Sequence, residues 1–213
     1  MSSFSDLLEG YRQFRSTGWR QQRERWETLR EGQSPRVMII ACSDSRVDPA
    51  QIFNTRPGEV FVVRNVAALV PPFELEGSYH GVSAALEFAI QVLKVDEVVV
   101  MGHGMCGGCQ AALTQELADA EPGQGGFIAN WIKMLGPARE QVVREHGHDP
   151  DRPALRAMEQ AAVQVSIDNL RTFPCVQHKE AKGTLKLIGA YFAISDGILH
   201  LLDHESGSFQ PVD

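Results

Sequence analysis

The sequence lacks several features that would point to whole classes of protein. Its 213 residues contain only four cysteines, too few to suggest a disulfide framework in a chain of this length. The longest apolar runs, residues 37–42 and 98–101, are far too short to span a bilayer. Residues 1–14 also lack the basic start and the continuous apolar segment of a signal peptide, so we expect a cytoplasmic protein with free thiols.

Positive charge is also scarce. Lys and Arg together number 20 and Asp and Glu number 27, which gives a formal net charge of −7. Neither nucleic acid nor an anionic membrane is attracted to an acidic surface, so we expect neither as a partner. The hydrophobic content of 43% and the charged content of 22% are ordinary for a soluble globular domain.

Residues 1–31 differ in pattern from the rest of the chain. Ser3, with Asp6 three residues later, predicts the start of a helix. Apolar side chains then recur at helical spacing, namely Phe4, Leu7, Leu8, Tyr11 and Phe14. An amphipathic arm cannot bury its apolar stripe alone, so it must lie on its own domain or on a partner subunit.

Residues 32–213 alternate between strand and helix patterns and form one predicted domain. We predict helices over residues 78–93, 109–118, 127–146 and 153–171, and strands over residues 37–42, 60–64, 98–101, 185–193 and 198–202. This order predicts an α/β fold: a mainly parallel central sheet of about five strands, the last antiparallel, flanked by helices and preceded by the N-terminal helical arm. The ligand site of such a sheet lies beyond the carboxyl ends of its strands.

Two motifs fall at such strand ends. Cys-Ser-Asp-Ser-Arg, residues 42–46, follows the first strand, and Gly-His-Gly-Met-Cys-Gly-Gly, residues 102–108, follows the third. If these strands are neighbours, Cys42, His103 and Cys106 come together. Two thiolates and one imidazole suit Zn²⁺, and three protein ligands leave the fourth tetrahedral position open, as in catalytic zinc sites.

Other interpretations of the same residues remain open at this point. A strand-end cysteine such as Cys42 can be a small buried apolar residue, and His103 can bind an anion or cap a helix. Cys106 and Cys109 form a C-x-x-C pair, which is found in redox sites and in structural zinc sites. A structural zinc site would normally draw on a second such pair, so we expect Cys109 to pack in the helix and Cys175 to bind no metal.

The two motifs in this order, with Pro57-Gly58-Glu59 and residues 61–67 between them, resemble the β-carbonic anhydrases, and the resemblance extends from Gln33 to Leu202. It implies one Zn²⁺ per chain, held by the two cysteines and the histidine of the motifs. It also implies reversible hydration of carbon dioxide to bicarbonate and a proton by a zinc-bound hydroxide. The resemblance further implies a homodimer or a higher homo-oligomer, with the arm packed on the partner subunit.

The resemblance also assigns roles to side chains around the metal. Asp44 and Arg46 match the catalytic Asp–Arg dyad of the family. The expected substrate-binding residues are Gln33, Phe61, Val66, Phe88 and Gly107. Phe88 stands where the plant-like subclass often has tyrosine, and Ala68 where asparagine is common, so the polarity of the pocket is left open.

Several alternatives accompany this assignment. Relatives of the fold hydrolyse carbonyl sulfide or carbon disulfide on the same type of zinc site. A non-catalytic protein stabilised by zinc and a thiol oxidoreductase using Cys106 and Cys109 are two further possibilities. Asp44 and Arg46 can also be read as an ordinary ion pair of the loop. We expect Arg64 to tie its strand to that loop rather than to bind substrate.

Overall fold

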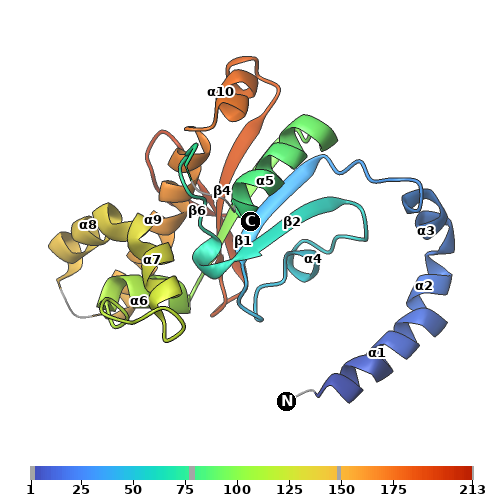
Figure 1. Cartoon of the computed structure of the whole chain (residues 1–213), viewed down its shortest axis with the longest axis horizontal. Coiled ribbons are helices and arrows are strands. Elements are labelled where there is room, and N and C mark those ends of the chain that lie inside the picture. The colour runs from blue at the N-terminus through green and yellow to red at the C-terminus, as the bar shows by residue number, and fades with distance from the viewer. Residues whose placement is uncertain (1–2, 77–79, 148–149, 213) are drawn as a thin grey trace. The chain divides into compact units, whose positions relative to one another are not determined.

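The protein divides into two compact units, Met1–Ser34 and Pro35–Asp213. The structure is a computed structural model that describes residues 3–76, 80–147 and 150–212 (Figure 1). None of the helices among these residues has the length and apolar character needed to cross a membrane.

The first unit consists of three helices, α1 (Phe4–Ser16), α2 (Gly18–Gln21) and α3 (Arg23–Leu29). A capping box starts α1, because the Asp6 N–H donates to the Ser3 hydroxyl and the Ser3 N–H donates to the Asp6 carboxylate at 2.7 Å. The predicted helix start at Ser3 is therefore confirmed. No residue of α1 is buried, which leaves its apolar stripe exposed.

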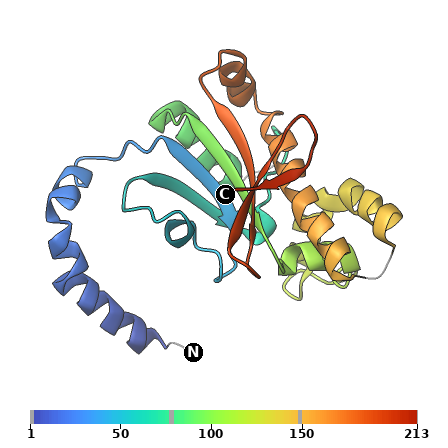
Figure 2. The same ribbon diagram turned by 180° about the vertical axis from the view of Figure 1, so that it is seen from behind.

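A six-stranded sheet forms the centre of the second unit (Figures 1 and 2). Its strands are β1 (Val37–Cys42), β2 (Val60–Asn65), β3 (Glu97–His103), β4 (Lys186–Ala193), β5 (Ile198–Leu202) and β6 (Phe209–Pro211). They lie in the order β2-β1-β3-β4-β5-β6, with parallel pairing as far as β4 and antiparallel pairing beyond it. The predicted α/β class with a mainly parallel sheet is confirmed, and β6 is an additional short edge strand.

Helices connect the strands, and their bounds differ in part from the prediction. They are α4 (Pro49–Ile52), α5 (Gly81–Glu87), α6 (Gly107–Thr114), α7 (Gly126–Ile132), α8 (Gly136–His146), α9 (Arg152–Leu170) and α10 (Pro174–Ala181). Short turns η1 (Val66–Ala68) and η3 (Lys133–Leu135) and the π-helical segment η2 (Phe88–Leu93) complete the set.

Two of these differences have local causes. The helix predicted over residues 127–146 is divided into α7, η3 and α8 near Gly136-Pro137, where proline cannot donate a backbone hydrogen bond. The predicted end of α6 near Ala118 was wrong, because Gln115 adopts a left-handed conformation with φ of 59° and stops the helix. The start predicted at Ser78 lies outside the described residues, and α10 was not predicted.

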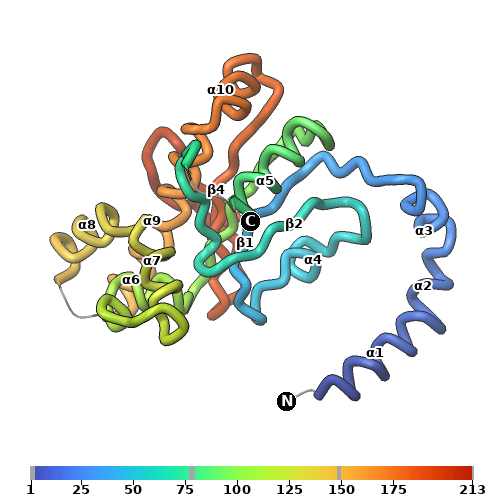
Figure 3. Tube along the Cα trace, viewed as in Figure 1, coloured from blue at the N-terminus to red at the C-terminus, as the bar shows by residue number. Residues whose placement is uncertain are grey.

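The packing of β1 and β3 brings the two motifs together. Both strands are almost wholly buried, as expected for parallel strands covered on both faces. Met38 and Ile40 of β1 face one apolar cluster, whereas Ile39 and Ala41 face another. Because β1 pairs directly with β3, the carboxyl ends of the two strands meet at one edge of the sheet (Figure 3).

Candidate metal centre and active site

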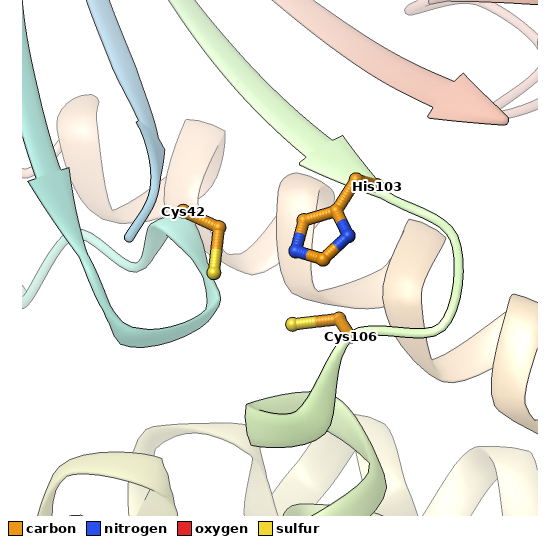
Figure 4. A group of neighbouring side chains, drawn as sticks. All are labelled: Cys42, His103 and Cys106. Carbon is orange, nitrogen blue, oxygen red and sulfur yellow. The ribbon is translucent and has the colours of Figure 1, made fainter. Parts of the chain in front are cut away.

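Three buried side chains meet at this edge of the sheet. Cys42 is the last residue of β1, His103 is the last residue of β3, and Cys106 caps the N-terminus of α6. Their potential ligand atoms all lie within 4.8 Å of one another, and the side chains point toward one another (Figure 4). Among the described residues, no fourth His, Cys, Asp or Glu belongs to this group.

The imidazole of His103 fits a metal ligand. Its Nδ1 lies 2.9 Å from the carbonyl oxygen of Gly104, and only a protonated nitrogen can donate to a carbonyl. This contact assigns the tautomer in which Nε2 carries the lone pair. The ring is 1% exposed, and its Nε2 has no hydrogen-bond partner among the described residues. A buried, unpartnered nitrogen is unfavourable unless it ligates something, and metal-bound histidines commonly donate from their other nitrogen in this way.

The two thiols need a cation to become thiolates. The neighbouring Cys106 thiol and burial raise the pKa of Cys42 to about 12. Contact with the Cys109 thiol is the main cause that raises the pKa of Cys106 to about 12, and contact with the Cys42 thiol acts in the opposite direction. A divalent cation displaces such protons on binding. Two thiolates and one imidazole suit Zn²⁺ and leave its fourth position open.

Beside the Cys42–His103–Cys106 group, Arg46 donates two parallel hydrogen bonds to the carboxylate of Asp44. Its Nε donates to Oδ1 at 2.9 Å and its Nη2 to Oδ2 at 2.6 Å. Arg46 Nη2 also donates to the carbonyl oxygen of Met105, the residue before Cys106. The hydrogen bonds from Arg46 to the carboxylate hold the pKa of the Asp44 carboxyl well below its usual range. The pair therefore links the loop after β1 to the loop that carries Cys106, which an ordinary ion pair within one loop would not do.

Arg64 ties its strand to the loop after β1, which confirms the prediction for this residue. From β2, its Nε donates to the carbonyl oxygen of Cys42 at 2.9 Å and its Nη2 to that of Asp44 at 2.6 Å. Its Nη1 lies 3.1 Å from Oδ2 of Asp48. The guanidinium thus fixes the backbone on both sides of Ser43.

Comparison with known proteins assigns the family. The carbonic anhydrase family model matches residues 37–199. A curated relative, beta carbonic anhydrase 3 of Arabidopsis thaliana, is 33% identical over 195 residues, which cover 92% of this chain and 75% of the relative. This chain belongs to the β-carbonic anhydrase family. The family consists of lyases, the carbonate dehydratases, so the chain is an enzyme of that class.

Solved β-carbonic anhydrases share the whole fold. The enzyme CcaA superimposes with a TM-score of 0.91 at 29% identity, covering 99% of this chain and 100% of that one. One of two tetrameric β-carbonic anhydrases from Sordaria macrospora gives a TM-score of 0.80 at 28% identity, covering 93% and 96% of the two chains. The arrangement of the sheet and helices is therefore that of a β-carbonic anhydrase.

The predicted pocket residues of this β-carbonic anhydrase come from several separate elements. Phe61 on β2 packs against Phe88, with ring centroids 5.8 Å apart, and Phe88 remains 42% exposed. Val66 follows β2 and approaches Gly108 so closely that a Cβ there would lie 2.7 Å from its Cγ1. Gly107 is the first residue of α6, and apart from its chain neighbours and its own helix no atom lies within 4 Å of the position that a Cβ would take there. Gln33 belongs to the first unit, and its role stays a prediction.

The remaining cysteines are free thiols. Cys109 is buried in the first turn of α6, and Cys175 is half-buried on α10. None of the four cysteines, all of which lie among the described residues, forms a disulfide. Neither Cys109 nor Cys175 belongs to the group of potential metal ligands.

One buried acidic residue of this β-carbonic anhydrase, Glu159, was not predicted from the sequence. Glu159 of α9 is 2% exposed and accepts the N–H of Cys106 at 2.9 Å. Its other carboxyl oxygen accepts the hydroxyl of Tyr191 at 2.9 Å, and burial raises the pKa of Glu159. The available signal was a single acid on an otherwise apolar helix face, between Leu155 and Ala162.

Proposed function

We propose that this enzyme catalyses the reversible hydration of carbon dioxide to bicarbonate and a proton, with one Zn²⁺ held by Cys42, His103 and Cys106. The observation that carries the proposal is the cluster of three buried ligand atoms within 4.8 Å, one of which is an unpartnered imidazole nitrogen. When bound, Zn²⁺ supplies the Lewis acidity that lets water act as a nucleophile near neutral pH.

In this proposal, Asp44 orients the attacking water and Arg46 orients Asp44. A carboxylate whose pKa is held low accepts a hydrogen bond from that water and turns one of its lone pairs toward carbon dioxide. The bidentate contact with Arg46 fixes both carboxylate oxygens, so the accepting direction is set in advance.

The predicted pocket residues supply the complementary environment. Carbon dioxide is apolar, so Phe61, Val66 and Phe88 suit its carbon and distal oxygen. Negative charge develops on the oxygens as bicarbonate forms, and the Gly107 N–H and the Gln33 side chain suit that charge. These roles are part of the proposal and follow from chemistry together with the family assignment.

Assay of three linear substrates tests the function directly. We expect zinc-loaded protein to hydrate carbon dioxide rapidly in a stopped-flow experiment that follows proton release with an indicator. Carbonyl sulfide and carbon disulfide should be hydrolysed much more slowly by the same preparation. Efficient hydrolysis of either compound without appreciable hydration of carbon dioxide would instead support the alternative substrate class.

We also propose a homodimer or higher homo-oligomer in which residues 1–31 pack on the partner subunit and residues 32–213 form the catalytic domain. The exposed apolar stripe of α1 and the separate compactness of the first unit support this arrangement. The solved Sordaria macrospora relatives are described as tetrameric. The free cysteines support a cytoplasmic location, since thiols persist in reducing compartments.

Deleting residues 1–30 should therefore weaken association and cause aggregation, because apolar surface that the arm covers would become exposed. The measurement is size-exclusion chromatography with light scattering over a range of protein concentrations. As a control, Arg12→Ala removes an exposed ion pair with Glu9 on the same helix and should leave the oligomer intact. A stable, active and strictly monomeric truncated protein would contradict this role of the arm.

A further inference from the structure

A buried carboxyl group lies directly beneath the loop that carries Cys106. The two oxygens of Glu159 have different partners, the backbone N–H of Cys106 and the hydroxyl of Tyr191, each at 2.9 Å. Tyr191 is itself buried on β4, and the guanidinium carbon of Arg156 lies 5.5 Å from the centre of its ring. Carboxyl groups are seldom buried this fully unless their partners fix them in a specific arrangement.

The loop above Glu159 has a backbone that needs external support. Met105 adopts the left-handed region with φ of 57°, which a side chain disfavours and which persists only where the surroundings impose it. The Gly104 N–H donates to the Phe192 carbonyl at 3.0 Å, and Arg46 holds the Met105 carbonyl. Glu159 holds the next backbone group, the N–H of Cys106, from the opposite direction.

Close packing supports this loop only in part. A cavity of about 160 Å³ adjoins Gly104 and Met105 and reaches Glu159 and Tyr191, so the loop has free space on that side. A Cβ on Gly104 would lie 3.2 Å from the Tyr191 hydroxyl, so that hydroxyl sits close beneath the loop. The hydrogen bond that Glu159 accepts from the Cys106 N–H and the one that Arg46 donates to the Met105 carbonyl therefore restrain the part of the loop that close packing leaves free.

We propose that Glu159 is a positioning residue of the metal centre, which fixes Cys106 through its backbone N–H, and that Tyr191 holds Glu159 in place. Glu159 acts through Cys106 and does not belong to the group of potential metal ligands. The inference rests on the proposed zinc function. When the Cys106 backbone is fixed, its Sγ stays within reach of the ligand atoms of Cys42 and His103, and the metal therefore dissociates slowly.

Four single variants of the full-length protein separate this role from a general effect on folding. Glu159→Ala removes both contacts, Tyr191→Phe removes only the support of Glu159, and Glu159→Gln keeps an oxygen that can accept the Cys106 N–H. Ser166→Ala is the matched control. Ser166 is equally buried on α9, but it forms hydrogen bonds with the backbone of Ala68 and Val70 and none with the loop that carries Cys106.

The first measurement is the rate at which a chromogenic chelator removes zinc from each variant. We expect Glu159→Ala to release zinc about 10–100-fold faster than the parent, Tyr191→Phe to be intermediate, and Glu159→Gln to stay close to the parent. Ser166→Ala should melt at a lower temperature and still release zinc at the parental rate.

The second measurement is the visible absorption of Co²⁺-substituted protein, whose d–d bands should change in Glu159→Ala and not in Ser166→Ala.

Parental zinc release and an unchanged Co²⁺ spectrum in Glu159→Ala would overturn the proposal, as would zinc release from Glu159→Gln as fast as from the alanine variant. If Glu159→Ala does not fold, Tyr191→Phe decides the question, and unchanged zinc release in that variant contradicts the proposal. A parent protein that binds no zinc at all would instead refute the proposed function, so the two failures are distinguishable.

Discussion

Loss of bound zinc is the expected result of Cys42→Ser, His103→Asn or Cys106→Ser. Each change removes one of three ligands from a group that has no fourth member among the described residues. Carbon dioxide hydration should fall by about 100-fold or more, because Lewis-acid activation of water contributes several kcal/mol to the rate. Elemental analysis of the purified protein and stopped-flow hydration assays measure the two effects in the same samples.

Cys109→Ser and Cys175→Ser provide matched controls for these ligand variants. Both replace a free thiol by a hydroxyl, and Cys109 is as fully buried as Cys106. Each control should keep about one zinc per chain and most of the activity. Loss of zinc from Cys109→Ser would show that the ligand assignment is wrong and that Cys109 takes part in metal binding.

Asp44→Asn and Arg46→Ala should each reduce hydration per bound zinc by about 100-fold. The zinc content at equilibrium should stay near one per chain, because loss of the Arg46–Met105 contact affects the rate of zinc release and leaves all three ligands in place. Neither side chain belongs to the group of potential ligands, whereas both would control the direction of the attacking water. The double variant should be little slower than the slower single variant, because residues that act as one unit have non-additive effects. Initial hydration rates of the parent, both single variants and the double variant provide the test.

The pH dependence separates orientation by Asp44 from its ionisation. Two thiolates cancel the charge of Zn²⁺, so we expect parental activity to fall below about pH 8, above the value near 7 of three-histidine sites. Arg46 holds the pKa of Asp44 well below its usual range, so Asp44 stays ionised throughout this fall. Loss of Arg46 raises that pKa toward the usual range of a carboxyl group, which lies far below pH 8, so the midpoint of the profile should not move in Arg46→Ala.

A second ion pair of the same loop supplies the control for the dyad. Asp48 accepts from the backbone at the start of α4 and pairs with Arg64. Asp48→Asn keeps a good helix cap and weakens that ion pair, so it should leave hydration near the parental rate. Near-normal rates in Asp44→Asn would contradict the role proposed for Asp44 and leave it as an ordinary loop residue.

Much of this site could be predicted from the sequence because its parts lie at the ends of strongly patterned strands. The buried runs of β1 and β3 marked both strands, and the adjacent motifs then had to meet at one sheet edge. The contacts of Arg64 were likewise predictable, because a cation on a strand beside a tight loop has few other partners.

Other features depended on tertiary contacts that no local pattern encodes. Glu159 is distant from Cys106 in the sequence and reaches it only because α9 packs beside β3 and β4. The three-residue strand β6 is too short to show alternation, and it forms by pairing with β5 at the sheet edge. Helix α10 had a recognisable start at Pro174, but its eight residues carry too little periodicity to be assigned.

Dependence of carbon dioxide hydration on bound zinc tests the proposed function most directly. Metal-free protein from one preparation is titrated with Zn²⁺, and the initial hydration rate is measured by stopped flow at each measured zinc content. The rate should rise linearly to about one zinc per chain and then stay constant, as one catalytic metal site requires. A rate independent of zinc content, or no hydration by fully loaded protein, would contradict the proposed function.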